Sequence, residues 1–267
     1  MKIQLLPRLF VLAAITFTFS VETACADDVI AKAYNIKDVS ELVVSGGGRV
    51  QITQGDTESL RVEATRDVME RVKVDLSGDK LSLSVRNTSG GFSFFDLFKH
   101  RNDDVLYVLQ LKKLHYLGLS GASRATFGNW VGGDMKVNVS GAGEAKFTHL
   151  RVNDLFVELT GASNSRVEIL TARTLKFELS GAANMDVKGA SQTNFLKIGA
   201  SGASNFRGKL LKAAQADVDA SGASNVDLQA TEYLKAGASG ASNIRYLGQP
   251  KLDSNASGAS NIKAIND

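Results

Sequence analysis

Apolar and polar residues alternate along the second half of the chain, in step with a recurring phrase, Ser-Gly-Ala-Ser-Asn. The residues one, three and five places before the first Ser are mostly apolar, such as Leu155, Val157 and Leu159, and those between them, such as Glu158, are mostly polar. A period of two predicts a β-strand with one face in the core. Because the same parity continues through the phrase, we expect one strand path of about thirteen residues that bends at the Gly, which has no side chain.

The phrase recurs at a nearly fixed period. It is intact at residues 201–205, 221–225, 239–243 and 257–261, and near-copies begin at Ser120, Ser140, Thr160 and Ser180. The starts lie 20, 20, 20, 21, 20, 18 and 18 residues apart. Such a period is typical of a solenoid in which each repeat forms one turn. The sequence therefore predicts an all-β fold, a parallel and right-handed β-helix or solenoid with turns of ~20 residues, stacked into a rod about 40 Å long.

Residues 27–119 are less regular, although alternating apolar residues still indicate half-buried strands. Residues 45–48 read Ser-Gly-Gly-Gly, which we interpret as a diverged copy of the phrase, and a short helical turn is expected near residues 67–71. A solenoid end needs covering. We therefore interpret this region as strands that start or cap the solenoid, residues 120–267 as its regular part, and residues 36–262 as one continuous domain.

Residues 88–104 interrupt the pattern with closely spaced aromatic residues. Gly90 and Gly91 lead into Phe92, Phe94, Phe95 and Phe98, and a polar stretch follows. Two interpretations remain open. The rings could form an exposed aromatic loop that contacts a partner or a membrane surface. They could also fold back and plug the open end of the core.

Parallel stacking places equal repeat positions above one another, so each position becomes a column. Two residues after the Asn, the column is charged, and its sign alternates over most of its length. We interpret it as an exposed ladder that stabilises register, with a recognition stripe as the alternative. The column consists of Lys146, Arg166, Asp186, Arg207, Asp227, Arg245 and Lys263.

The Asn of the phrase forms a second column. Stacked amides can donate and accept along the column, and Asn also tolerates the left-handed backbone that a sharp corner can require. A row of identical amides and hydroxyls could instead face a carbohydrate, so these residues are both candidate ladder and candidate binding residues. They are Asn164, Asn184, Asn205, Asn225, Asn243 and Asn261.

The first residues predict export. Lys2 and Arg8 precede the apolar run 9–19, and Ala24-Cys25-Ala26 has the small residues of a cleavage site, so residues 1–26 are expected to be a signal peptide rather than a retained anchor. Cleavage removes the only cysteine and leaves 29 Lys and Arg against 27 Asp and Glu. A charge so close to neutral does not indicate nucleic acid as a partner. We expect a periplasmic, surface or extracellular location, with no integral membrane segment after cleavage.

No motif for catalysis, a cofactor or a metal stands out. The three histidines, His100, His115 and His149, do not have metal-ligand spacing, and no nucleophile elbow, P-loop or dinucleotide motif is present. We predict a protein that is not an enzyme and has no cofactor. The alternative is a polysaccharide-acting β-helix enzyme, a lyase or hydrolase, which would show converging carboxylates in a deep groove near Glu158 or Glu178.

The Ser-Gly-Ala repeats, the Ser45-Gly46-Gly47-Gly48-Arg49-Val50 segment and the export signal together resemble the putative auto-transporter adhesin head GIN domain family. The resemblance covers roughly residues 36–262 and implies a parallel β-helix-like fold with a role in adhesion or envelope binding. The family has no motif of functional residues to carry over. No translocating domain follows the last repeat, so we expect that the chain does not export itself. The partner implied is a glycan, an envelope component or a surface protein.

Overall fold

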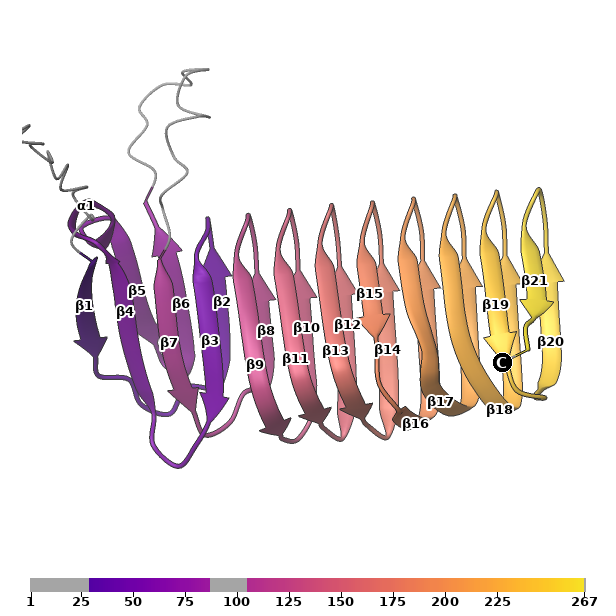
Figure 1. Ribbon diagram of the computed structural model, residues 1–267, viewed down its shortest axis with the longest axis horizontal. Helices are drawn as coiled ribbons and strands as arrows, with labels where there is room; N and C mark the ends of the chain where they lie inside the picture. The colour runs from indigo at the N-terminus through magenta and orange to yellow at the C-terminus, as the bar shows by residue number, and fades with distance from the viewer. Residues whose placement is uncertain (1–28, 87–104, 267) are drawn as a thin grey trace, which may run out of the picture.

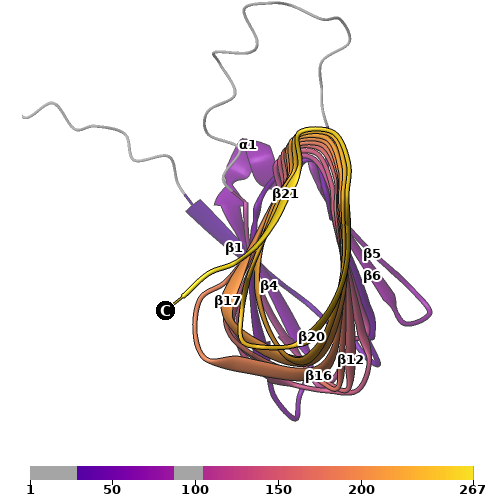
Figure 2. The ribbon, with the colours of Figure 1, turned by 90° about the vertical axis from the view of Figure 1, so that its right-hand side faces the viewer.

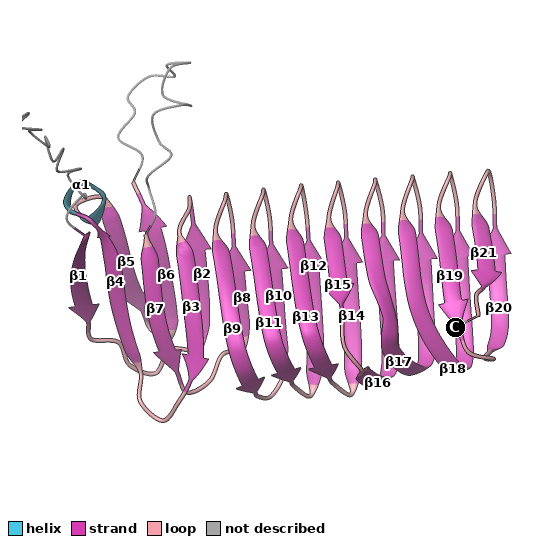
Figure 3. Cartoon of the chain, in the orientation of Figure 1, coloured by secondary structure: helices cyan, strands magenta, loops and turns pink. Residues whose placement is uncertain are grey.

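The structure is a computed structural model, and it describes residues 29–86 and 105–266. The predicted signal peptide and the aromatic residues Phe92, Phe94, Phe95 and Phe98 lie outside these ranges. The described chain is a long stack of strands with one short helix near its N-terminal end (Figures 1 and 3). The all-β solenoid that the repeat period predicts is confirmed. In the described residues, no helix is long and apolar enough to cross a bilayer.

Two long faces make up the solenoid. Face A carries the strands that precede each phrase, and face B carries the strands that follow it. In spatial order, face A consists of β5 (Val72–Ser77), β6 (Lys80–Val85), β2 (Glu41–Ser45), β8 (Tyr116–Leu119), β10 (Met135–Val139), β12 (Asp154–Leu159), β14 (Thr174–Leu179), β16 (Ser191–Ala200), the second halves of β17 (Asn205–Ala220) and β18 (Asn225–Ala238), and β20 (Lys251–Ala256).

Face B follows the same axis. Its strands, in spatial order, are β1 (Val29–Tyr34), β4 (Ser59–Thr65), β7 (Leu106–Leu111), β3 (Arg49–Gln54), β9 (Arg124–Val131), β11 (Glu144–Arg151), β13 (Asn164–Thr171), β15 (Asn184–Val187), the first halves of β17 and β18, β19 (Asn243–Leu247) and β21 (Asn261–Ala264). From β3 onward all these pairs are parallel, as the repeat predicts.

Seen along its axis, the solenoid is narrow at the phrase turns and widens toward the opposite side (Figure 2). That side is a short third wall, which we call the base; it consists of residues 130–131, 150–151, 170–171, 191–193 and 211–213. Two consecutive exposed residues mark the corner between face B and the base, for example Glu168 with Ile169 and Lys209 with Leu210. A flat strand would bury one of each pair, so the break in alternation shows where the backbone bends.

Each phrase forms a tight turn between the faces, and the structure corrects two predictions here. The phrase Gly is exposed rather than inward, with φ between 71° and 80° in all eight regular copies, and it separates two strands instead of bending one. A Cβ on Gly202 would lie 2.6 Å from the carbonyl oxygen of Gly181 in the rung before. Only glycine fits, because the left-handed backbone and the close stacking both exclude a side chain. Within the described residues, no Asn has positive φ, so the left-handed role proposed for Asn was wrong.

The second Ser of the phrase closes the turn from inside. Its hydroxyl donates to the carbonyl oxygen of the first Ser, at 2.8 Å for Ser123 to Ser120 and 2.8 Å for Ser224 to Ser221. Both donors are fully buried. A buried hydroxyl needs a partner, and this local bond supplies one while it fixes the turn. The alternation that continues through the phrase predicts an inward position for this Ser, and that prediction is confirmed.

The core is a continuous column of apolar side chains along the axis. In its N-terminal half, Phe127 stacks on Phe147 with ring centroids 4.5 Å apart and meets Trp130 edge-on at 5.6 Å. Toward the C-terminus the residue before each phrase becomes small, and Ala200, Ala220 and Ala238 replace the earlier Leu and Val.

The first rungs do not stack in chain order. Strands β2 and β3 form a rung that lies between β6–β7 and β8–β9, although β6 and β7 come later in the chain than β3. In this inserted rung, Gly46 takes the place of the phrase Gly, because its carbonyl oxygen accepts from the backbone N–H of Ala122. This confirms that residues 45–48 are a diverged copy of the phrase.

Antiparallel strands cover the N-terminal end. Strand β4 pairs antiparallel with both β1 and β7, and β5 pairs antiparallel with β6. The helical turn expected near residues 67–71 is α1 (Arg66–Met69), which buries Val68 beside these strands. The reversal of direction ends the parallel stack on this side. At the other end, β20 is exposed along its whole length.

Candidate functional site

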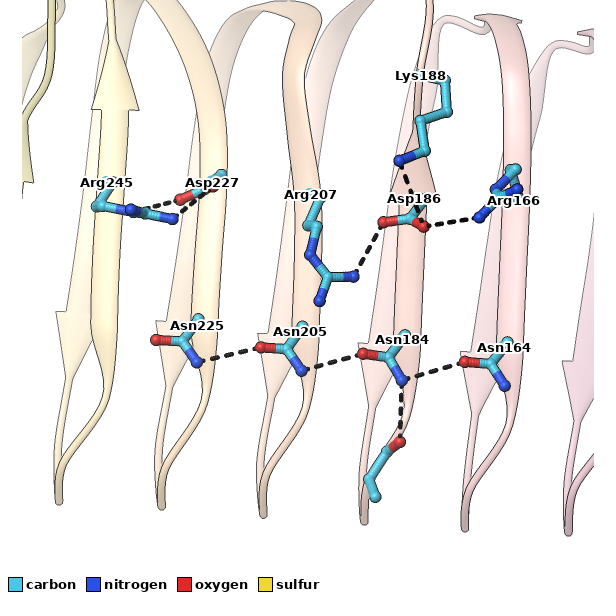
Figure 4. Close-up of polar contacts among 11 residues, drawn as sticks. Asn164, Arg166, Asn184, Asp186, Lys188, Asn205, Arg207, Asn225, Asp227 and Arg245 are labelled. Carbon is cyan, nitrogen blue, oxygen red and sulfur yellow. Dashed lines mark hydrogen bonds and ion pairs between the residues drawn. The ribbon is translucent and has the colours of Figure 1, made fainter.

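The Asn side chains form a hydrogen-bonded ladder next to the phrase turns on face B (Figure 4). The Nδ2 group of each amide donates to Oδ1 of the Asn one rung nearer the N-terminus, at 3.1 Å for Asn184 to Asn164 and 3.0 Å for Asn205 to Asn184. The same bond, 3.1 Å long, continues through Asn225 and Asn243. Each interior amide thus uses one donor and its acceptor within the column, which leaves one N–H for other contacts.

The charged column lies beside the Asn ladder and is joined by ion pairs between rungs (Figure 4). Asp186 contacts Arg166 at 3.6 Å, Arg207 at 3.1 Å and Lys188 at 3.7 Å. Lys146, earlier in the column, pairs instead with Glu144 of its own strand at 2.9 Å. Opposite charges therefore neutralise one another along the column, which favours a ladder that holds register over a recognition stripe of one sign.

A groove runs along face A beside the phrase turns. It consists of three consecutive hollows of about 250 Å³ each, and neighbouring hollows share residues: Glu158 and Thr160 line the first two, and Asp219 and Ser221 line the last two. The groove extends from Val43 of β2 to Ser257 after β20. It therefore spans most rungs of the solenoid and is long and shallow rather than deep.

Two columns of polar residues line the groove. The first is the opening residue of each phrase, and the second is the residue two places earlier. Asn138 belongs to the second column, and its Oδ1 atom is buried without a hydrogen-bond partner in the described part of the chain. The columns supply hydroxyls from Ser120, Ser140, Thr160, Ser180, Ser201, Ser221, Ser239 and Ser257, and carboxylates or amides from Asn138, Glu158, Glu178, Asp219 and Asn255.

Glycines in the second column make room for the carboxylates. Gly199 follows Glu178 in register, and a Cβ at Gly199 would collide with Oε2 of that Glu. In the same way, a Cβ at Gly237 would lie 2.6 Å from Oδ1 of Asp219. Each acid thus leans over a glycine of the next rung along the floor of the groove.

An aromatic ring lies on the base side of the groove on face A. Phe156 stands between two lysines, with Lys136 Nζ 5.1 Å and Lys176 Nζ 4.7 Å from the ring centroid. A further hollow surrounds this ring, and at its edge Arg173 donates two hydrogen bonds of 3.1 and 2.5 Å to Asp154. The Arg173 guanidinium lowers the pKa of the Asp154 carboxyl.

The groove offers hydrogen bonds but shows no arrangement of a catalytic pair. Glu158 and Glu178 are neighbours in register, and Lys176 Nζ lies 3.3 Å from Glu178. Both acids line an open hollow rather than a deep cleft. In the residues that the structure describes, no group of three His, Cys, Asp or Glu side chains could hold a metal ion.

The sequence located the Asn and charged columns on face B and missed the groove. The predicted Asn residues lie on the face B side of the phrase turns, whereas the groove lies on the face A side. The sequence did contain a signal for the groove, because Gly118, Gly199 and Gly237 occupy the repeat position that carries Glu or Asp in other repeats. That alternation of glycine and acid becomes meaningful only when the rungs stack.

Residues 38–250 match the family described as putative auto-transporter adhesin, head GIN domain. The chain belongs to this family. A comparison with proteins of curated function finds no significant match.

Solved structures share the head GIN domain fold. A putative adhesin from Parabacteroides merdae has a TM-score of 0.78 at 16% identity, and one from Parabacteroides distasonis has 0.75 at 17%. A protein from P. distasonis described as a putative lipid binding protein has 0.67 at 16%. Each comparison covers 90% of this chain and 98% of the other. At these identities the likeness extends to the fold alone. The family and these neighbours carry names of adhesins and of a lipid-binding protein, not of enzymes.

Proposed function

We propose that this head GIN domain is an exported, non-enzymatic binding protein that holds an extended glycan in the groove on face A. The observation that carries the proposal is the continuity of the groove, since consecutive hollows share Glu158, Thr160, Asp219 and Ser221. A linear polymer can contact many rungs at once, and each rung presents the same kinds of group. Once one unit of the polymer is bound, the next units are held at a high effective concentration beside the following rungs, so weak contacts together give a high affinity.

The chemistry of the groove fits a polymer of hydroxyl groups. Carboxylates accept hydrogen bonds, Ser and Thr hydroxyls both donate and accept, and Asn138 has an acceptor atom that no group in residues 29–86 or 105–266 satisfies. The groove is also open along its length, so a glycan can bind without its ends entering the groove. The adhesin name of the family supports attachment to an extracellular or envelope surface.

The test is a glycan-binding assay with a groove-blocking variant. The protein should begin at Asp27, the form expected after signal removal. Ser221→Tyr places a ring where two hollows meet, and Thr126→Tyr adds the same ring to an exposed position of face B. We expect the amount of protein retained on a glycan that binds the unmodified chain to fall at least tenfold for Ser221→Tyr and to stay unchanged for Thr126→Tyr. Equal binding by the two variants would show that the groove is not the site.

Location is tested separately by protease treatment of intact cells and of cells with a permeabilised outer membrane. Loss of the mature chain from intact cells would support attachment at the cell surface. Loss only after permeabilisation would place the glycan partner inside the envelope, and the adhesin role would be wrong.

A further inference from the structure

The base of the solenoid exposes large apolar side chains from several rungs. Val131 is 59% exposed, Leu210 is 54%, Ile169 is 40% and Phe195, at the corner with face A, is 37%. These residues come from strands β9, β17, β13 and β16. Val131 shares a column with Arg151 and Thr171, whereas Ile169 shares the neighbouring outward column with Asn129 and His149. The two columns run side by side along the axis, one on each side of the inward residues Trp130, Leu150 and Leu170. Exposed apolar side chains gathered along one edge indicate a contact surface.

Cationic residues lie between these apolar positions. Arg151 is in register with Val131, and Lys209 and Lys212 flank Leu210. All three cations are exposed, and none has a carboxylate within 4 Å among the described residues. Glu168 is the acid nearest to Ile169 in the chain, on the corner of the same rung. Apolar side chains flanked by unpaired cations are typical of surfaces that lie in the interface of an anionic membrane.

We propose that the base, with its corner residues, docks on an anionic phospholipid bilayer, with Val131, Ile169 and Leu210 entering the interfacial layer and Arg151, Lys209 and Lys212 contacting lipid phosphates. The two columns run along the rod, so the solenoid lies flat on the membrane. The four hollows of the groove and of Phe156 lie on face A, so they take no part in this contact.

Docking through the base would leave the groove open. The phrase turns lie at the opposite end of the cross-section from the base (Figure 2), and the groove follows the phrase turns. The membrane and the glycan would therefore be held on opposite sides of the same rod. This inference does not depend on the proposed glycan site, because the two surfaces share no residue.

The experiment is sedimentation of the chain from Asp27 with vesicles, which avoids insertion of the apolar run 9–19. One set contains phosphatidylcholine alone, and the other contains phosphatidylcholine with phosphatidylglycerol. We compare an apolar variant (Ile169→Ser with Leu210→Ser), a charge variant (Lys209→Gln with Lys212→Gln) and a matched control on face A (Lys235→Gln with Lys251→Gln). All six positions are exposed, so the variants should melt at the wild-type temperature.

We expect binding to the anionic vesicles only, with a loss of at least tenfold in the apolar and charge variants and less than twofold in the control. An equal loss in the control would overturn the proposal, since overall charge would then explain the binding. The proposal would also be overturned if the apolar variant still bound the vesicles and a soluble anionic polysaccharide competed for that binding. The base would then be a polyanion site.

Discussion

The carboxylate of Asp227 accepts two hydrogen bonds from the guanidinium of Arg245, at 2.6 and 2.8 Å, although Asp227 is only 7% exposed. The two residues lie 18 positions apart, in the first of the short repeats, yet they remain in register. The bidentate pair thus holds two rungs together where the chain between them has lost two residues. Planar, two-point contacts of this kind fix geometry more strongly than single ion pairs.

Removal of Arg245 should destabilise the solenoid more than removal of Arg166, because Asp227 pairs with Arg245 whereas Asp186 has three cationic partners. Arg245→Ala leaves a buried carboxylate without its partner, which costs about 1–3 kcal/mol. Arg166→Ala breaks one contact of 3.6 Å to Asp186, which keeps Arg207 and Lys188 as partners, and such a loss costs about 0–1 kcal/mol. Thermal unfolding of the two variants measures the difference. Equal melting temperatures would show that Asp227 finds water or another donor.

The phrase Gly should tolerate substitution far less than the second Ser. Gly202→Val forces a β-branched residue to φ +76° and brings Cβ to 2.6 Å from a backbone oxygen. Ser204→Ala removes one buried hydroxyl and its bond to Ser201, at a cost of about 1 kcal/mol. We expect soluble, folded Ser204→Ala and a strongly destabilised or insoluble Gly202→Val. Similar circular dichroism melts for the two would contradict the turn geometry.

The Asn ladder should respond to position within the column. Asn205→Ala removes two amide bonds, one to Asn184 and one from Asn225. Asn164→Ala removes one bond between ladder members and one long, exposed bond of 3.4 Å to the carbonyl oxygen of Ala162, which should contribute little. At about 1 kcal/mol of net stability per bond, the interior variant should unfold at a lower denaturant concentration. A reversed order would mean that the ladder does not stabilise the stack.

Asp154 gives a prediction on pH. Its hydrogen bonds from Arg173 lower its pKa, so the charged form is favoured in the folded state. A lowered carboxyl pKa contributes stability above the unfolded pKa, near 3.9, and this contribution is lost as the pH falls through the folded pKa. Arg173→Gln should return the Asp154 pKa toward its ordinary value. A carboxyl NMR titration checks this directly, and an unchanged midpoint would show that the pair does not form in solution.

The glycan groove should bind its polymer without cutting it. Incubation with a bound polysaccharide should leave its chain length unchanged, while Glu178→Gln weakens retention because a neutral amide is a weaker hydrogen-bond acceptor than a carboxylate. Size-exclusion chromatography of the polymer reports cleavage, and affinity electrophoresis reports binding. New reducing ends that disappear in Glu178→Gln would favour the enzyme alternative.

Much of the regular part was accessible from the sequence, because its determinants are local. A period of two places Leu159 inward and Glu158 outward, and a fixed repeat length stacks Asn184 on Asn164 and Asp186 on Arg166. These relationships need only the strand geometry and equal spacing. The sequence could not show the sign of φ within the phrase. It suggested that Asn takes the left-handed backbone, whereas glycine does so in every regular copy, because the backbones of successive turns pack too closely for a Cβ.

The order of the first rungs and both proposed binding surfaces were decided by tertiary structure. The β2–β3 rung lies between strands that follow it in the chain, and alternation cannot encode which edge a strand joins. The groove depends on Gly199 beside Glu178 and on Asn138 near Thr160, which are neighbours only through stacking. The base depends on where the backbone bends. Ile169 and Leu210 each follow an outward residue, so they would point inward in a straight strand. Local periodicity thus determines each rung, and long-range packing determines the surfaces that the rungs build together.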